Sequence, residues 1–287
     1  MSALVINGRE IARVIRDRLK DQVTGIQLQM GIQPKLGILC SDASPASVSY
    51  QEALLKNADS VGIQVELARF QEGTPQEDLE AKIVEWNKDR NMHGIFALQP
   101  LFAGINVDEL RVLLHPLKDI ECVHPYDSSL KYFSTDHVGS CTAMAIMEIL
   151  QFIKVPLEGA EVTVVGHSRI VGQPVSKMLI EKNATVTICN KATSDRNLLR
   201  RHVEQAEILV VAIGKPNYIP GDWIREGAVV IDVGVNDIGD EKFVGDVEFE
   251  TAQERASYIT PAIGGVGPVT AIIGMRQLVI AYKLQQG

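Results

Sequence analysis

Residues 162–174 read VTVVGHSRIVGQP and join an apolar run to a helical pattern through a turn that contains glycine. Gly166 stands at the end of the expected strand, and Gly172 stands in the first turn of the expected helix. Glycine at these places lets the backbone approach a pyrophosphate, which the free N–H groups and the dipole of a helix N-terminus attract. The spacing is GxSxxxG, with Ser168 where the usual fingerprint has its second glycine. Dinucleotide binding and a purely structural strand–helix turn are therefore both open.

The alternation of strand and helix extends from this stretch through most of the chain. The apolar runs expected as buried parallel strands are residues 35–40, 63–70, 94–98, 161–166, 184–189, 208–214 and 227–234. The segments with helical spacing are residues 46–61, 76–86, 142–154, 171–181 and 270–284. This pattern predicts an α/β protein in two domains, with the boundary in the helix expected over 142–154.

Composition excludes several classes of protein. The chain has 287 residues, enough for two domains at roughly 150 residues each. Acidic residues outnumber basic ones, 36 to 28, which gives a net charge of −8 and argues against a dominant surface for nucleic acid or an anionic membrane. The sequence shows neither a signal-peptide pattern nor a membrane-length apolar run, so we expect a soluble cytoplasmic protein. The four cysteines form no CxxC pair, so we predict reduced thiols and no metal site.

Two further segments bear on ligands. The strand that follows the glycine turn ends in Cys189, Asn190 and Lys191, where a site that prefers NAD usually carries an acid. A lysine favours the 2′-phosphate of NADP, although a solvated loop lysine is the alternative. Residues 260–268, TPAIGGVGP, hold three glycines and two prolines and predict either a stiff loop that lines a ligand or a tight structural crossover.

The motifs together resemble the bifunctional methylenetetrahydrofolate dehydrogenase/cyclohydrolase family. The segments that carry the resemblance are VINGREIA, SPASVSY, HPLKDIE, HPY, GHSRIVGQP, ATVTICN, GKPNYIPGDWIREGAVVIDVGVN, VGDV and TPAIGGVGPVT. The resemblance implies a folate-binding domain over residues 1–145, completed by the C-terminal helix at 270–287. It implies a Rossmann-like NADP domain over residues 146–269, a cleft between the domains, and a homodimer. It also implies a tetrahydrofolate derivative as the substrate, with NADP as cofactor and NAD as the alternative.

The resemblance implies a set of site residues. Tyr50 and Glu121 are the catalytic candidates. The residues expected to bind the folate substrate are Tyr50, Leu54, Leu98, Gln99, Pro100, Glu121, Gly264, Gly265 and Pro268. The residues expected to bind the cofactor are Gly166, His167, Ser168, Arg169, Ile170, Asn190, Lys191, Thr193, Gly214 and Val235.

The sequence departs from the family motif at three chemically important positions, and the first two form a polar pair in the family. The family has a tyrosine followed four positions later by a catalytic lysine, but Tyr50 is followed by Leu54. Lys56 is two residues further on and is rotated by about 200° around an ideal helix. The family glutamine that is hydrogen-bonded to that lysine corresponds to Leu98, with Gln99 displaced by one position. A conventional bifunctional enzyme would need Lys56 or Gln99 to recover the role by a local shift.

These departures predict which half of the chemistry survives. The family aspartate that holds the pterin ring corresponds to Glu121, which keeps the carboxylate. Leu54 and Leu98 supply neither a proton nor a hydrogen bond, so we expect cyclohydrolase activity to be weak or lost. Hydride transfer depends mainly on distance and orientation. The leading hypothesis is an NADP-dependent dehydrogenase. The alternatives are a repurposed enzyme that transfers the methylene carbon to another nucleophile, with Glu121 or Tyr50 as acid–base group, and a non-catalytic folate- or nucleotide-binding paralogue.

Overall fold

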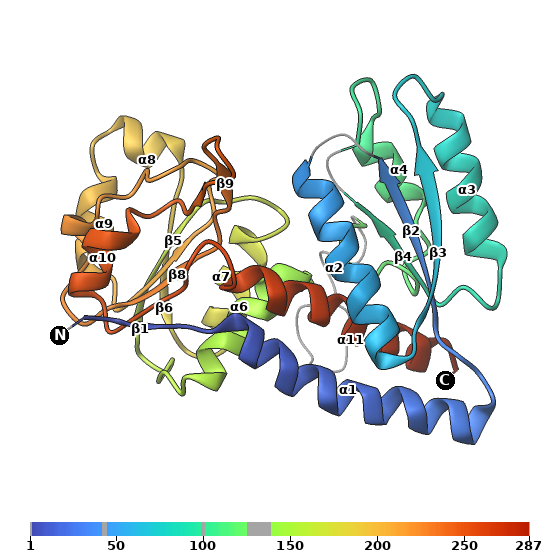
Figure 1. Ribbon diagram of the computed structural model, residues 1–287. Coiled ribbons are helices and arrows are strands. Elements are labelled where there is room, and N and C mark those ends of the chain that lie inside the picture. Colours follow the sequence, from blue (N-terminus) through green and yellow to red (C-terminus); the bar gives the residue numbers. More distant parts are fainter. Residues whose placement is uncertain (1, 42–44, 99–100, 125–138, 287) are drawn as a thin grey trace. The chain divides into compact units, whose positions relative to one another are not determined.

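The computed structural model describes residues 2–41, 45–98, 101–124 and 139–286 (Figure 1). The contacts between residues divide the chain into two compact units. Unit 1 comprises residues 1–12 and 142–270, and unit 2 comprises residues 13–141 and 271–287. Two long helices, α1 (Gly8–Met30) and α11 (Val266–Gln286), each contribute residues to both units.

The described part of unit 1 contains a six-stranded sheet in which all paired strands are parallel. Its order is β1-β11-β8-β7-β5-β6. The strands are β1 (Leu4–Val5), β5 (Glu161–Val165), β6 (Thr185–Cys189), β7 (Ile208–Val211), β8 (Val229–Asp232) and β11 (Tyr258–Ile259). Every residue of β7 and β8 is buried, as expected for apolar strands that are covered on both faces. The edge strand β6 exposes Thr185 and Ile188.

Helices cover both faces of this sheet. The helical elements of unit 1 are α6 (Cys141–Phe152, whose first residue belongs to unit 2), α7 (Gly172–Ile180), α8 (Lys191–Asp195), α9 (Leu199–Gln205), the 3-10 turn η1 (Gly221–Trp223) and α10 (Phe249–Arg255). In Figure 1, α9 and α10 lie to the left of the sheet, α8 lies above the ends of its strands, and α6 and α7 lie to its right. Leu199 and Val203 of α9 and Ala252 of α10 join one apolar cluster with the sheet. A short hairpin, β9 (Asn236–Asp237) and β10 (Phe243–Val244), follows β8.

Unit 2 is built on a three-stranded parallel sheet of order β3-β2-β4. The strands are β2 (Lys35–Ser41), β3 (Gln64–Phe70) and β4 (Gly94–Ala97), and the helices are α2 (Pro45–Val61), α3 (Gln76–Lys88) and α4 (Val107–Leu113). A Cβ atom on Gly37 would lie 2.7 Å from the ring of Trp86 in α3, and one on Gly94 would overlap Leu278 in α11. Gly94 pairs with Leu36, the neighbour of Gly37, so the two glycines face opposite sides of the sheet. Helices α3 and α11 therefore cover opposite faces.

The structure confirms the two-unit α/β architecture and corrects three details of it. Residues 1–12 group with unit 1, not with the folate-type part, because β1 pairs with β11. Strands β7 and β8 end earlier than expected, at Val211 and Asp232, where the chain turns into loops. Helix α11 begins at Val266 instead of residue 270, so Pro268 is helical. A proline is tolerated in the first turn because the N–H it lacks would have no partner there.

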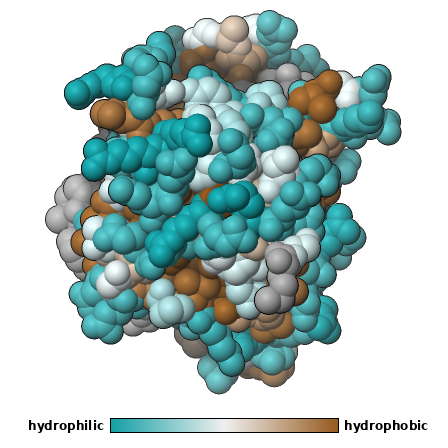
Figure 2. All heavy atoms as spheres, turned by 90° about the vertical axis from the view of Figure 1, so that its left-hand side faces the viewer, coloured by the Kyte–Doolittle hydropathy of each residue, from teal (hydrophilic) through white to brown (hydrophobic). Residues whose placement is uncertain are grey.

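The surface and the helices add two observations. Hydrophilic side chains cover most of the face shown in Figure 2, and apolar ones are scattered among them. Of the helices in the described part of the chain, none combines the length and apolarity needed to span a membrane.

The first turn of α1 packs against the glycine-rich segment over residues 260–268. The backbone N–H of Gly8 donates to the carbonyl of Gly264 at 2.8 Å. A Cβ atom on Gly8 would overlap the carbonyl oxygen of Gly265, and one on Gly265 would overlap the carbonyl of Pro261. The tight backbone approach that the sequence suggested for this segment is therefore made by the chain itself.

This contact predicts opposite effects for two glycines of the same helix. Gly8→Ala should lower the free energy of unfolding by about 3 kcal/mol, because the added methyl group meets a backbone oxygen that cannot rotate away. Gly25→Ala should raise it by about 0.5–1 kcal/mol, because no atom lies within 4 Å of the new Cβ and alanine favours a helix. Urea unfolding followed by circular dichroism measures both, and a Gly8 variant as stable as the wild type would contradict the packing described.

Candidate functional site

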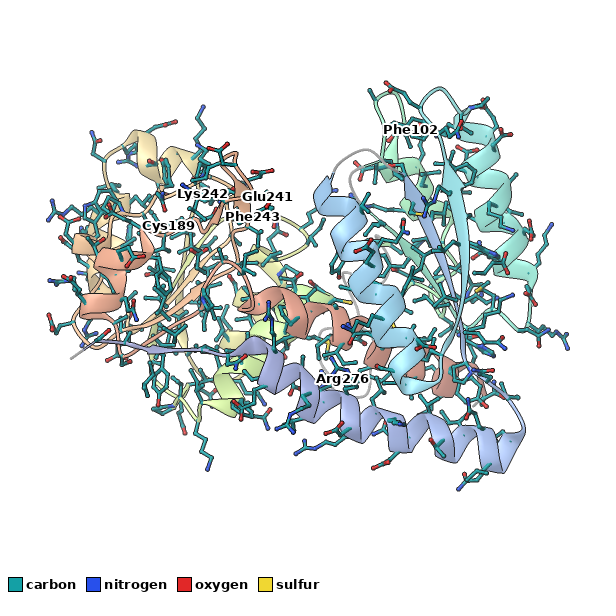
Figure 3. All side chains as sticks on the ribbon, in the orientation of Figure 1. Phe102, Cys189, Glu241, Lys242, Phe243 and Arg276 are labelled. Atoms are coloured by element: carbon teal, nitrogen blue, oxygen red, sulfur yellow. The ribbon has the colours of Figure 1, made fainter. Side chains whose placement is uncertain are left out.

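A pocket of about 360 Å³ lies at the carboxyl ends of β5, β6 and β7 in unit 1. The chain passes from β5 to β6 on one side of β5 and returns to β7 on its other side. Strand order thus reverses at β5, and open parallel sheets bind ligands at such a reversal. The lining residues are Val165, Gly166, His167, Ser168, Cys189, Asn190, Lys191, Ser194, Leu199, Ala212, Ile213, Lys215 and Tyr218. Cys189, at the end of β6, can be located in Figure 3.

The turn after β5 needs its glycines for the backbone itself. Gly166 has a φ of +117°, and a Cβ atom there would overlap the carbonyl of Ala212. A Cβ atom on Gly172 would overlap the carbonyl of Gly166. The Ser168 hydroxyl accepts hydrogen bonds from the N–H groups of Val171 at 3.1 Å and Gly172 at 3.4 Å, so it braces the chain before α7. The turn is structurally required and also lines the pocket.

The turn after β6 presents Lys191. The side chain of Asn190 accepts from the N–H of Thr193 at 3.2 Å, and the Thr193 hydroxyl accepts from the N–H of Asn190 at the same distance. This reciprocal capping box closes the first turn of α8. Lys191, which lies between the two residues of the capping box, is exposed and lines the pocket.

The structure brings together part of the expected cofactor set. Those that line the pocket are Gly166, His167, Ser168, Asn190 and Lys191. Those outside its lining are Arg169, Ile170, Thr193, Gly214 and Val235. Sequence reasoning did not anticipate Ser194, Lys215 and Tyr218. The available signal was the polar run GKPNY, which directly follows a predicted parallel strand whose end belongs to the same sheet edge.

Two buried aspartates hold the loops around this pocket. The carboxylate of Asp246 accepts from the backbone N–H groups of Ile213 at 2.7 Å, Gly214 at 3.0 Å and Lys215 at 2.8 Å. Asp232 accepts from the N–H groups at 234, 246 and 247, at 2.9, 3.1 and 2.8 Å. Burial raises the pKa of Asp232 to about 7, against the lowering effect of these hydrogen bonds.

A second group of side chains converges within unit 2. A Cβ atom on Gly274 of α11 would lie 3.9 Å from Leu54, 3.9 Å from Phe96 and 4.0 Å from the Sγ atom of Cys141. Leu54 is fully buried, and the rings of Tyr50 and Phe96 are 6.1 Å apart. Helix α2, strand β4 and the start of α6 thus meet α11 at an apolar centre that carries one thiol and borders one phenol.

Glu121 adds a carboxyl group to this centre. The residue is half-buried, and desolvation of its carboxyl raises its pKa to about 8, with a further increase from the charge of Asp119. A hydrogen bond from the Ala97 backbone, at the end of β4, acts in the opposite direction. Burial also raises the pKa values of Tyr50 and Cys141. The neighbouring Cys141 and then Glu121 raise the pKa of Tyr50 further, and Glu121 raises that of Cys141. At neutral pH the phenol, the thiol and most of the carboxyl are therefore protonated.

The expected folate residues divide between the two units. Gly264, Gly265 and Pro268 belong to unit 1, and Tyr50 and Glu121 belong to unit 2. Leu98 is buried close to the end of β4. Gln99 and Pro100 lie outside the described residues. Within the described part of the chain, no group of three or more His, Cys, Asp or Glu residues could hold a metal ion. The four cysteines are buried and form no disulfide.

Two family models match the chain in succession. Residues 6–121 match the catalytic domain of tetrahydrofolate dehydrogenase/cyclohydrolase, and residues 140–286 match the NAD(P)-binding domain of the same family. The chain belongs to the tetrahydrofolate dehydrogenase/cyclohydrolase family. It is therefore a folate-linked, NAD(P)-dependent enzyme of the dehydrogenase type.

Individual relatives agree with this assignment over nearly the whole chain. The chain is similar to "Bifunctional protein FolD 2" of Geobacter sulfurreducens, with 42% identity over 283 residues and 98% of each chain covered. It is 40% identical over 270 residues to "Bifunctional protein FolD" of Bacillus licheniformis, and the aligned region covers 94% of each chain. Among solved structures, the methylenetetrahydrofolate dehydrogenase-cyclohydrolase of Trypanosoma brucei, complexed with NADP and an inhibitor, has a TM-score of 0.94. It has 32% identity, with 99% of this chain and 98% of that chain covered.

In this member of the family the two matches map onto different chemical environments. The pocket at β5, β6 and β7 lies in the NAD(P)-binding match, and the centre around Tyr50 and Glu121 lies mainly in the catalytic match. The C-terminal residues 271–286 fall in the NAD(P)-binding match, yet the structure groups them with unit 2. The Arg276 side chain, labelled on α11 in Figure 3, therefore belongs with the second environment.

The raised pKa of Glu121 predicts how stability depends on pH. The folded chain holds this proton up to about pH 8, whereas the unfolded chain releases it near 4.5. Ionisation therefore costs stability as the pH rises through this window. Relative to Glu121→Gln, which cannot ionise, the wild type should lose on the order of 1–3 kcal/mol of unfolding free energy between about pH 5 and pH 9.

Urea unfolding at several pH values measures this difference. The contribution of Asp232 is common to both proteins and cancels in the comparison. The exposed Glu158→Gln serves as control and should follow the wild-type curve. Parallel curves for the wild type and Glu121→Gln would show that Glu121 is not held neutral.

Proposed function

We propose that this enzyme oxidises methylenetetrahydrofolate with NADP and that its cyclohydrolase activity is weak or lost. The proposal that cyclohydrolase activity is weak or lost rests on Leu54, which is fully buried near Phe96 and Cys141. The resemblance to the family expects a catalytic lysine at this position. Lys56, the nearest lysine along α2, is exposed, which speaks against a simple exchange of roles.

The pocket of unit 1 fits a phosphorylated dinucleotide chemically. Its described lining contains two lysines and several hydroxyl or amide groups but no carboxylate. The net charge of the chain is −8, so this local excess of positive charge runs against the overall balance. When bound, NADP would supply the acceptor for a hydride. Gly166, Ser168 and Lys191 would contact its anionic part.

The centre in unit 2 would orient the folate and exclude water. Tyr50 and Glu121 carry protons at neutral pH and can donate hydrogen bonds to ring nitrogen or carbonyl groups of a pterin. Leu54 and Leu98 contribute only apolar surface. Attack of water on a methenyl carbon needs a group that positions or deprotonates the water. Leu54 and Leu98, which stand where the resemblance expects the polar pair, cannot do either.

One alternative has specific support. A dry centre next to a neutral carboxylic acid would protect an iminium-like one-carbon unit and could protonate a product, as transfer to another nucleophile requires. In that case Glu121 would be the acid. The homodimer and the cytoplasmic location expected from the sequence stay predictions, as does the preference for NADP over NAD.

A spectrophotometric assay distinguishes these functions. With methylenetetrahydrofolate and NADP⁺, reduced cofactor and methenyl product should appear in equal amounts, and the methenyl product should then decay at its uncatalysed rate. Leu54→Lys combined with Leu98→Gln should accelerate that decay by about 100-fold or more, since positioned acid–base groups contribute 10²–10⁴. Leu54→Met is the matched apolar control and should leave the decay unchanged.

Three results would change the assignment. Wild-type hydrolysis as fast as oxidation would restore the bifunctional activity. Folate binding by calorimetry without cofactor reduction would favour the transfer reaction. Failure to bind either ligand would favour a non-catalytic paralogue.

A further inference from the structure

The cofactor pocket carries a second lysine that the nucleotide motifs do not include. Lys191 follows β6 and Lys215 lies four residues after the end of β7, and both line the pocket. Because β5 lies between β6 and β7, the two ammonium groups reach the pocket from two different loops. Both side chains are exposed, so each can contact a ligand.

A hydroxyl pair connects the two loops. The Tyr218 hydroxyl and the Ser194 Oγ atom are 2.6 Å apart, and Ser194 lies three residues after Lys191 on α8. The ammonium of Lys215 lies 4.8 Å from the centre of the Tyr218 ring, a distance at which the ring attracts a cation. Tyr218 thus holds Lys215 near the hydroxyl pair.

Asp246 determines which groups of this loop can bind an anion. Its carboxylate already accepts from the backbone N–H groups of residues 213, 214 and 215. These N–H groups are therefore committed to the protein and are not offered to a phosphate. Lys215 is the basic side chain that this loop presents to an anion.

We infer that Lys215, together with Lys191 and the Ser194–Tyr218 hydroxyl pair, binds a phosphomonoester on the ribose of the adenosine moiety. Such a group carries nearly two negative charges at neutral pH, which suits two ammonium groups and the one hydroxyl of the pair that does not donate to the other. A ribose without this phosphate would leave both lysines without an anionic partner. This inference rests on the proposed dinucleotide function and adds to it a specificity-determining residue, Lys215, positioned by Asp246.

Calorimetry with two nucleotides that differ only in the phosphate tests the inference. Adenosine 2′,5′-bisphosphate and adenosine 5′-monophosphate are titrated into the full chain. Lys215→Ala should weaken binding of the bisphosphate about 10-fold, as expected for loss of one charge-assisted contact, and binding of the monophosphate by less than about 2-fold. Tyr218→Phe, which keeps the ring but loses the hydroxyl, should weaken the bisphosphate selectively by about 3-fold.

Lys182→Ala is the matched control, because Lys182 is an exposed lysine of unit 1 outside the pocket lining. It removes the same charge and should leave both affinities unchanged. Equal losses for both nucleotides in Lys215→Ala, or no loss for either, would overturn the inference. If the wild type prefers the bisphosphate and Lys215→Ala retains that preference, only this inference fails. If the wild type binds neither nucleotide, the proposed cofactor fails with it.

Discussion

The hydrogen bonds between two buried carboxylates and backbone N–H groups hold the nucleotide-type pocket in its shape. Asp246 binds the loop after β7, and Asp232, at the end of β8, binds the segment that contains Asp246. The N–H groups of these loops have no strand or helix partners, and a buried N–H group without a partner is costly. The carboxylates satisfy them as a set. The close packing leaves room only for glycine at two places, since a Cβ atom on Gly234 would overlap Asp246 and one on Gly245 would overlap Asp232.

This arrangement explains why the segments DVG and VGDV are chemically linked although they are separated in sequence. Each supplies a carboxylate and a glycine, and the glycine of one makes room for the carboxylate of the other. Burial still outweighs the three hydrogen bonds to Asp232, because the pKa of this residue rises to about 7. The amide of Asn236 donates to Asp246 at 2.9 Å and so ties the hairpin that follows β8 to the same centre. The wall of the pocket therefore depends on side chains that do not line it.

The sequence allowed the fold to be predicted further than the site. Apolar runs and helical spacing located the central strands and helices because burial on both faces leaves a strong pattern. Short pieces such as β1 and α8 escaped, since two or five residues carry little periodicity. The glycine turn predicted Gly166 and Ser168 in the pocket, because a local motif forms a local turn. Lys215 could not be found in this way: it is joined to the pocket by strand order and by Asp246, which lies 31 residues away.

The centre around Tyr50 and Glu121 in unit 2 shows how one residue can set the charge state of another. A lysine at position 54 would bring an ammonium group to the centre that Glu121 and Cys141 share, and a nearby cation favours the ionised form of a carboxyl. With Leu54 in that place, burial controls Glu121 and its pKa rises to about 8. On the proposed function, leucine in place of a lysine would therefore have two consequences from one cause. It would remove the group that activates water, and it would leave Glu121 as a carboxylic acid donor instead of a carboxylate acceptor. An acid that donates one hydrogen bond recognises a different face of a heterocycle from a carboxylate that accepts two, so residue 54 would influence how the ring is oriented as well as what happens to it.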